Sequence, residues 1–244
     1  MNELKSGYID IHTHILPGVD DGAKDIDMTS KMLQIAYEQG VRSIIATPHF
    51  QLGKKVTKED LTVAYKKVQQ EIESLGLDIN LYLGNEIMYQ EGCLEAVKDG
   101  SALTLAGSRY VLIEFGYEVS YKTIYRGMQQ FIQAGYLPII AHVERYSALR
   151  KKENYINDLI ELGCYIQMNG KSLMGGPFNK FSSWCKHLVK NGYVHFIASD
   201  CHNETERPPM LGDCINRFEK RKDDYELCRL TINHPSYIIN NQVL

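Results

Sequence analysis

The sequence lacks the features of a membrane or secreted protein. No apolar run approaches the roughly 20 residues that span a bilayer, and the first residues show no charged and then apolar signal region. We therefore expect no membrane insertion and a cytoplasmic location. The formal net charge of −3 provides no general attraction for nucleic acid, so no nucleic-acid partner is expected. Any function must reside in a local site.

Clustered cysteines, repeats and low-complexity segments are also missing. The chain has 244 residues, of which 44% are hydrophobic, and can bury one large core without covalent cross-links. We therefore expect one domain, residues 1–244, with free thiols. None of the six cysteines occurs in CxxC spacing: Cys93, Cys164, Cys185, Cys201, Cys214 and Cys228.

Short β-branched or apolar runs alternate with segments of helical character. The seven predicted strands are 8–14, 43–48, 79–86, 110–115, 138–143, 164–169 and 194–200. The crossover helices include 57–75, 122–134, 151–162 and 178–191. This alternation is typical of parallel βα units in an α/β fold. Seven such units without a composition break favour a closed or nearly closed barrel, with a doubly wound open sheet as the alternative.

The first helix is the clearest, because Asp25 or Asp27 can cap its start and Gly40 can end it. The longest loose stretches between predicted elements are rich in Gly, Pro or charge. These stretches are 15–24, 50–57, 170–178 and 201–210. We expect them to form the rim of a site.

Histidines and carboxylates gather where the predicted strands end. His12 and His14 lie two residues apart on the first strand, so their side chains share a face. Asp200 and His202 repeat this spacing at the last strand. The carboxyl ends of parallel strands open on one face of a barrel, so all these side chains should converge there. The remaining candidates are Asp21, His49, Glu86, Glu114 and His142.

Nine candidate ligands exceed the about four to six contacts that one ion needs, so two or three ions are expected. Imidazole and carboxylate ligands without thiolate suit Mn²⁺, Fe²⁺, Co²⁺ or Zn²⁺. Glu86 and Glu114 are carboxylates able to bridge ions. Asp10 lies one step deeper than His12, which suits a carboxylate that orients an imidazole. The other three histidines are expected to be structural: His187, His195 and His234.

The charge of such a cluster indicates its substrate. Three divalent ions and four carboxylates would leave a net charge of about +2, which a phosphate dianion would balance. Arg145 follows His142 and Arg207 follows His202 closely enough for both guanidinium groups to hold phosphate oxygens. Hydrolysis of a phosphoester is therefore the expected chemistry.

With these residues assembled, the sequence resembles the polymerase-and-histidinol-phosphatase (PHP) superfamily. The shared features are the HxH motif of the first strand, the strand-end His and Glu residues, and Asp200-Cys201-His202. The segments 15–22 (ILPGVDDG), 46–49 (ATPH), 141–145 (AHVER) and 198–200 (ASD) look like the bacterial tyrosine phosphatases of capsule and exopolysaccharide loci, the CpsB/YwqE type. The resemblance covers essentially the whole chain.

The resemblance implies a distorted (β/α)₇ TIM-like barrel, the PHP fold, with three metal ions, usually Mn²⁺. It implies hydrolysis of phosphotyrosine, chiefly on the tail of a cognate bacterial tyrosine kinase, by direct attack of a metal-bridged hydroxide. Arg145 and Arg207 match the family's phosphate-binding arginines. By the family motifs, the three ligand sets would be His12, His14, Glu86 and Asp200; Glu86, Glu114 and His142; and Asp21, His49 and His202.

Three alternatives are considered. The nearest is a histidinol-phosphate phosphatase, or another PHP enzyme of a small phosphoester, on the same fold. A second is a thiol-based phosphatase, because Cys201 and Arg207 have Cys-x₅-Arg spacing; the segment has no Gly and carries Glu204 and Glu206 where the phosphate would sit, which argues against it. A third is a non-catalytic, metal-stabilised binding module, which the surplus of carboxylates disfavours.

Overall fold

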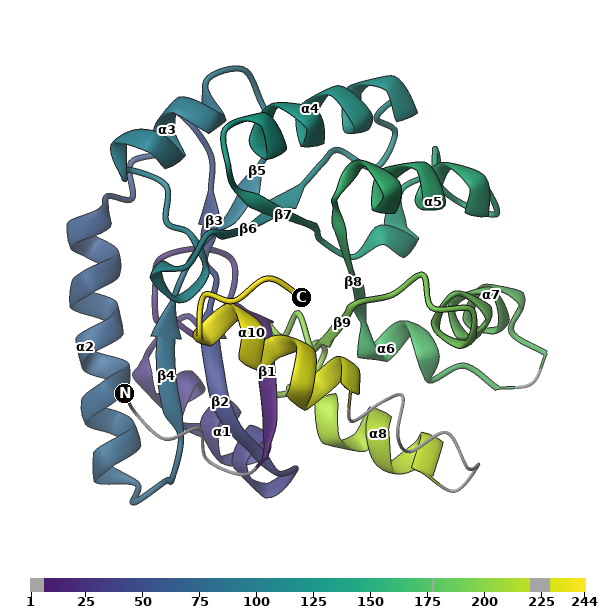
Figure 1. Ribbon diagram of the computed structural model, residues 1–244. Helices are drawn as coiled ribbons and strands as arrows, with labels where there is room; N and C mark the ends of the chain where they lie inside the picture. Colours follow the sequence, from purple (N-terminus) through teal and green to yellow (C-terminus); the bar gives the residue numbers. More distant parts are fainter. Residues whose placement is uncertain (1–6, 177, 220–228) are drawn as a thin grey trace.

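The computed structural model describes residues 7–176, 178–219 and 229–244. It has an α/β fold in which every strand pairing is parallel, and the sheet is curled, with helices around its outside (Figure 1). The strands are β1 (Tyr8–Thr13), β2 (Val41–Ala46), β3 (His49–Phe50), β4 (Asn80–Leu83), β5 (Glu86–Met88), β6 (Tyr110–Glu114), β7 (Leu137–Ile140), β8 (Tyr165–Asn169) and β9 (Phe196–Ala198). All seven predicted strand regions therefore contain strand.

One predicted strand is divided in the structure, and the short strand β3 was not predicted. The strand order is β1-β2-β4 in one sheet and β3-β5-β6-β7-β8-β9 in the other. The predicted strand 79–86 is interrupted at Gly84 and Asn85, where a side chain on Gly84 would meet Leu105 at 2.8 Å. The Asn85 side chain bridges the break, since it donates to Pro48 O (2.9 Å) and accepts from Leu103 N (2.8 Å).

The first and last strands meet at their carboxyl ends. Thr13 forms a parallel bridge with Cys201. Asp200 N donates to His12 O and His14 N donates to Cys201 O, both at 2.9 Å. These bonds place the end of β1 beside the end of β9 although the two are far apart in the sequence.

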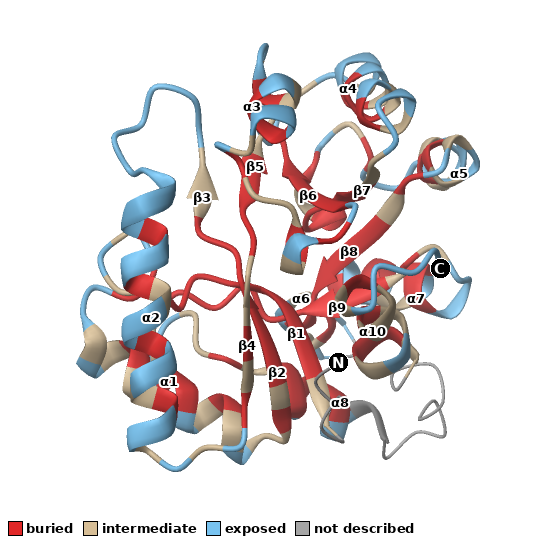
Figure 2. Ribbon diagram, turned by 60° about the vertical axis from the view of Figure 1, so that its left-hand side comes forward, coloured by how far each residue is buried: buried red, intermediate tan, exposed pale blue. Residues whose placement is uncertain are grey.

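Most of the helices lie on the outer face of the sheet (Figure 2), whereas the C-terminal helix crosses in front of the first strand (Figure 1). Asp25, rather than Asp27, caps the first helix by accepting from Met28 N (2.9 Å), and Gly40, at φ +87°, follows its end. The helices are α1 (Ile26–Glu38), α2 (Lys58–Ser74), α3 (Cys93–Asp99), α4 (Tyr121–Gln133), α5 (Glu153–Leu162), α6 (Gly170–Leu173), α7 (Lys180–Lys190), α8 (Leu211–Glu219) and α10 (His234–Ile239), with shorter turns η1 (Leu105–Gly107), η2 (Val143–Arg145) and η3 (Arg229–Asn233). The sequence analysis located the long helices α1, α2, α4, α5 and α7 and assigned no residue ranges to the others.

The core has two parts. The larger packs the sheet against the surrounding helices, for example Ile113 and Ile166 against Met128 and Leu159. The smaller includes Ile11, Leu112, Ile139 and Phe196 from the strands and Ile238 from α10. The C-terminal segment also bonds near the starts of β6 and β9, because Tyr110 Oη donates to Gln242 O and His234 Nδ1 lies 2.8 Å from His195 O. The opposite, carboxyl end of the strands is left for the site.

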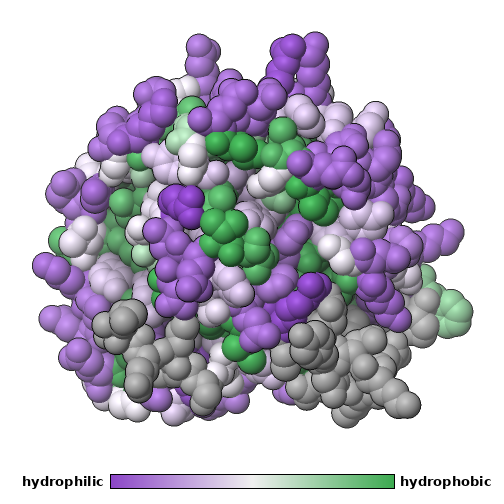
Figure 3. Space-filling model, viewed as in Figure 1, coloured by the Kyte–Doolittle hydropathy of each residue, from purple (hydrophilic) through white to green (hydrophobic). Residues whose placement is uncertain are grey.

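The surface carries hydrophilic side chains interspersed with small hydrophobic patches on the face seen in Figure 3. In the described part of the chain, no helix combines the length and apolar character needed to cross a bilayer. Five cysteines are buried free thiols, as the sequence predicted: Cys93, Cys164, Cys185, Cys201 and Cys214. Cys228 lies outside the described residues.

Candidate metal centre

The structure brings all nine candidate ligands together at the carboxyl ends of the strands. Glu86 lies at the centre of this cluster. Its Oε2 atom is 3.2 Å from His12 Nε2 and 3.3 Å from His14 Nε2. The same oxygen is 3.1 Å from His49 Nδ1, while Oε1 is 2.8 Å from His142 Nε2. One carboxylate therefore contacts four imidazoles, which come from the end of β1, the start of β3 and the segment that follows β7.

The remaining candidates surround this centre. Asp200 Oδ1 is 3.5 Å from His14 Nε2. Asp21 Oδ1 lies 3.2 Å from His49 Nε2 and 3.6 Å from His202 Nε2. Glu114 Oε1 lies 3.1 Å from His49 Nδ1. The cluster thus extends from the end of β9 to the end of β6.

Potential ligand atoms form three groups whose members lie within 4.8 Å of one another. These are His12, His14 and Asp200; His49, Glu86 and Glu114; and His14, Asp21, His49 and His202. The first and third overlap two of the ligand sets that the family motifs imply. The second differs, because His49 takes the place of His142, whose Nε2 is 3.7 Å from Glu114 Oε2. Carboxylate and imidazole donors in this number suit several divalent ions.

The electrostatics of the cluster favour positive charge at its centre. Burial alone would raise the pKa of Glu86, but the neighbouring His12 and His14 hold it well below the usual range. Burial would lower the pKa of His49, yet its contacts with Glu114 and Glu86 raise it to about 10. Protons on the imidazoles thus balance the carboxylates in the protein without ions. Divalent cations could replace those protons.

His202 provides a specific test of whether an ion fits. Burial, and then the like charge of His14, lower the pKa of His202 to about 3, so its ring is neutral at physiological pH. Its Nε2 atom is buried and has no hydrogen-bond partner among the described residues. A neutral imidazole nitrogen that faces carboxylates without a donor is a suitable metal ligand. The residues present therefore fit a metal centre.

Two candidate ligands have unusual backbone conformations. His142, directly beyond β7, has φ +31°, and Asp200, beyond β9, has φ +53°. The left-handed region costs a residue with a side chain about 1–2 kcal/mol. Such strain concentrates at functional sites, where the surrounding structure holds it in place.

Asp20 belongs to the site although the sequence indicated only its neighbour Asp21. Its Oδ2 lies 2.7 Å from His14 Nδ1 and accepts from His49 N at 3.1 Å. Burial would raise the pKa of Asp20, but the contact with His14 lowers it to about 2. The adjacent Asp-Asp pair in the first loop was a signal that both carboxylates have a role.

The sequence analysis also did not identify two amide side chains on β8. Gln167 Oε1 accepts from His142 N (2.7 Å) and lies 3.2 Å from His12 Nδ1. Gln167 Nε2 donates to Asn169 Oδ1 (2.9 Å), and Asn169 Nδ2 donates to Asp200 Oδ2 (2.7 Å). The backbone donor of His142 determines the amide orientation, so His12 Nδ1 must carry a proton, and Nε2 is the ring atom that could bind an ion. The signal was that, among the seven predicted strands, only 164–169 has no candidate ligand at its end.

Asp10 has different contacts from those expected. Its carboxylate accepts from Ser199 N (3.0 Å) and His12 N (3.4 Å), which are backbone groups rather than an imidazole ring. Burial raises its pKa to about 6 despite these bonds. Because Asp10 lies deeper on β1, it reaches the backbone directly after β9. The rings of His12 and His14 contact Gln167 and Asp20 instead.

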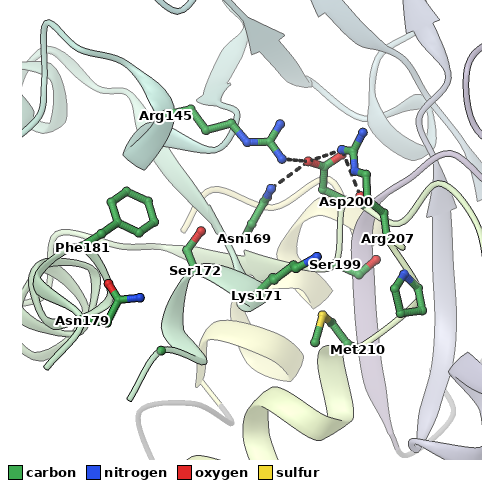
Figure 4. A pocket seen from close by; sticks show the side chains of 12 residues that line it. Arg145, Asn169, Lys171, Ser172, Asn179, Phe181, Ser199, Asp200, Arg207 and Met210 are labelled. Carbon is green, nitrogen blue, oxygen red and sulfur yellow. Dashed lines mark hydrogen bonds and ion pairs between the residues drawn. The ribbon is translucent and has the colours of Figure 1, made fainter. Parts of the chain in front are cut away.

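Arg145 and Arg207 reach the cluster from the side of Asp200. The Nη2 atoms of Arg145 and Arg207 lie 2.6 Å and 2.9 Å from Asp200 Oδ2 (Figure 4). They line a pocket of about 200 Å³. A second pocket, of about 370 Å³, includes Asp21, His49 and Glu114. Each of the four loose stretches noted in the sequence contributes residues to the lining of one pocket or the other.

The remaining three histidines and Cys201 do not belong to the cluster of candidate ligands. His187 is on α7 and His234 begins α10, while His195 Nδ1 accepts from Ile166 N at 3.1 Å. Cys201 is 1% exposed, and burial raises the pKa of its thiol to about 12. A buried, protonated thiol is chemically inert, so the Cys-x₅-Arg match does not form a thiolate phosphate loop.

Comparison with known proteins agrees with this geometry. Residues 8–240 match the family model described as capsular polysaccharide synthesis, CpsB/CapC. The tyrosine-protein phosphatase CpsB of Streptococcus pneumoniae is 33% identical over 242 residues, 97% of this chain and 100% of the relative. The tyrosine-protein phosphatase YwqE of Bacillus subtilis is 29% identical, over 97% of this chain and 93% of the relative.

A solved structure is also similar. It comes from a study of YwqE from Bacillus subtilis and CpsB from Streptococcus pneumoniae, described as metal-dependent tyrosine phosphatases. It superimposes with a TM-score of 0.89 at 29% identity, over 97% of this chain and 96% of the other. By sequence along nearly its whole length, this chain belongs to the CpsB/CapC family of capsular polysaccharide synthesis.

Proposed function

We propose that this chain is a metal-dependent protein-tyrosine phosphatase. The observation that carries the proposal is the convergence of nine imidazole and carboxylate side chains on one face, with two arginines beside them. The activity named for CpsB and YwqE supports phosphotyrosine as the substrate. No observation on this chain favours histidinol phosphate.

The proposed metal centre holds up to three ions, with Mn²⁺ as the expected metal and Co²⁺, Fe²⁺ or Zn²⁺ as alternatives. Bound divalent ions would supply positive charge at the phosphoryl group and lower the pKa of a coordinated water. The proposed ligands are the nine candidates. Asp20 and Gln167 would orient the rings of His14 and His12, because they contact the Nδ1 atoms opposite the cluster.

The arginines would hold the phosphoryl oxygens. Arg145 and Arg207 donate to one carboxylate oxygen of Asp200, and an incoming phosphate dianion could accept from the same guanidinium groups. Their charge would stabilise the phosphoryl group as the bond to the tyrosine oxygen breaks. A phenolate, with a pKa of about 10, is a moderate leaving group, so no proton donor is assigned.

The remaining parts of the proposal concern fold, location and partner. We infer a single domain, residues 1–244, that forms a distorted (β/α)₇ barrel; the bonds between the ends of β1 and β9 support it. A cytoplasmic location is inferred from the hydrophobicity pattern of the sequence. A substrate tyrosine on a cognate bacterial tyrosine kinase follows from the family resemblance alone.

The test is activity and metal content measured together. Chelation should abolish hydrolysis of a phosphotyrosine peptide, Mn²⁺ or Co²⁺ should restore it, and His12→Ala or Glu114→Ala should fold but bind less metal. The substrate panel should include a phosphoserine peptide and histidinol phosphate. Full activity after metal removal verified by elemental analysis would overturn the metal mechanism, and a higher kcat/KM for histidinol phosphate would overturn the substrate assignment.

A further inference from the structure

The pocket beside Asp200 has a wall that phosphate binding alone does not require. In Figure 4 the Phe181 ring lies across the pocket from Asp200 and Arg207, with the Lys171 side chain between them and Met210 below. The Phe181 side chain is 37% exposed, so part of its ring is open to the pocket. An aromatic surface therefore faces the proposed phosphate site.

Several hydrogen bonds hold this wall in place. Asn179 Oδ1 caps α7 by accepting from Ser182 N (3.0 Å), and Ser182 Oγ donates to Leu173 O (3.0 Å). A side chain on Gly175 would meet Ser182 Cβ at 2.5 Å, so this loop packs closely against α7. Phe181, in the first turn of α7, is thus carried on a supported element.

The charge of the pocket is unbalanced. Arg145, Lys171 and Arg207 contribute three cations to its lining, and Asp200 is the only acidic side chain among the described residues that line it. Asp200 is already bonded to both arginines. The pocket therefore attracts an anion, while Phe181 and Met210 offer apolar contact. A ligand that combines a dianion with an aromatic ring matches this lining better than an alkyl phosphate does.

The size of the pocket agrees with one such group. Its volume of about 200 Å³ corresponds to roughly six or seven waters, which is room for a single side chain. A phosphoserine places the peptide backbone close to phosphorus, so it would leave Phe181 uncovered. The aromatic spacer of phosphotyrosine could instead reach along the pocket wall.

We propose that Phe181 determines specificity by packing against the ring of phosphotyrosine while Arg145 and Arg207 hold its phosphate. This inference rests on the proposed tyrosine-phosphatase function and adds the residue that distinguishes aryl from alkyl phosphates. Phe181 contacts the non-reacting part of the substrate and takes no part in the bond-breaking step.

The test measures binding without turnover. Benzylphosphonate and ethylphosphonate are titrated calorimetrically into the metal-loaded protein, since neither can be hydrolysed. Phe181→Ala should weaken benzylphosphonate binding about two- to tenfold and leave ethylphosphonate binding unchanged. Phe181→Tyr should restore the preference. The matched control is Phe178→Ala, because Phe178 is 97% exposed, lies three residues earlier and does not line the pocket.

Each outcome decides the inference. Equal weakening of both phosphonates by Phe181→Ala, no weakening of either, or no binding of benzylphosphonate to the unaltered protein would overturn it. Hydrolysis of a phosphotyrosine peptide is measured in parallel on the same preparations. Normal hydrolysis with no effect of Phe181→Ala would reject only the role of Phe181, whereas Phe181-dependent binding without hydrolysis would reject only the proposed function.

Discussion

Arg145 and Arg207 donate to the same oxygen of Asp200, Oδ2, while the other oxygen, Oδ1, faces His12 and His14 at 3.6 Å and 3.5 Å. Asp200 therefore connects the candidate metal centre with the proposed phosphate site. Together these neighbours lower its pKa far below the usual range, against the opposing effect of burial. Replacing either arginine should therefore change the electrostatic environment of Asp200 as well as the binding of the substrate.

Replacing either arginine should reduce kcat/KM. Arg145→Ala and Arg207→Ala each remove a charged hydrogen bond worth about 1.5–3 kcal/mol, which corresponds to about 10- to 150-fold in kcat/KM for a phosphotyrosine peptide. Because both side chains contact one oxygen, the double variant should lose less than the product of the single effects. Arg126→Ala, on the exposed part of α4, is the control. Fully multiplicative losses would show that the two arginines act independently.

Gln167 should tune metal affinity without being a ligand. Gln167→Met keeps the approximate shape of the side chain but removes the acceptor for His12 Nδ1 and His142 N. Loss of such an orienting contact typically weakens metal binding about 10- to 100-fold. Titration of Mn²⁺ into the metal-free variant measures the effect, and circular dichroism verifies folding. Unchanged affinity in the folded variant would mean that His12 is oriented without Gln167.

Cys201→Ser should keep most of the activity, with kcat within about threefold of the unaltered protein at saturating Mn²⁺. The thiol is buried and its raised pKa of about 12 prevents nucleophilic attack. Placing a hydroxyl there should cost about 1–3 kcal/mol of unfolding free energy. Steady-state kinetics, denaturant unfolding and acid trapping of phosphoenzyme are the measurements. A trapped phosphocysteine, or a loss of several orders of magnitude, would contradict the metal-dependent mechanism.

His195 should make the metal-free protein sensitive to mild acid. Burial, and then the nearby His234, lower its pKa to about 4, from 6.5 in the unfolded chain. The unfolded state therefore takes up the proton first, and stability is lost as the pH falls from about 6.5 to about 4. The maximum loss is about 3 kcal/mol.

The matched variant is His195→Asn, because an amide oxygen can still accept from Ile166 N. Denaturant unfolding of both chelated proteins between pH 7 and pH 4.5 should show that the variant loses about 2 kcal/mol less. Parallel pH profiles of the two proteins would assign the acid sensitivity to other groups.

The sequence by itself determined the strand regions and the polar residues at their ends. The apolar runs 111–113 and 138–141 are followed directly by Glu114 and His142, and this contrast can be recognised without knowledge of distant contacts. The long helices could be predicted for the same local reason, as the cap at Asp25 and the end at Gly40 illustrate.

Only the tertiary structure decided which amide and aromatic side chains join the site and which groups Asp10 contacts. Gln167 and Asn169 look like ordinary polar strand residues until the curl of the sheet brings β8 beside His12 and Asp200. Asp10 was expected to contact an imidazole ring. Because the ends of β1 and β9 lie side by side, its carboxylate instead accepts a hydrogen bond from Ser199 N. Phe181 gave no signal at all, because its position depends on how α7 packs beside the pocket. Local patterns carry no information on such contacts, since these depend on strand register and helix packing between residues far apart in the chain.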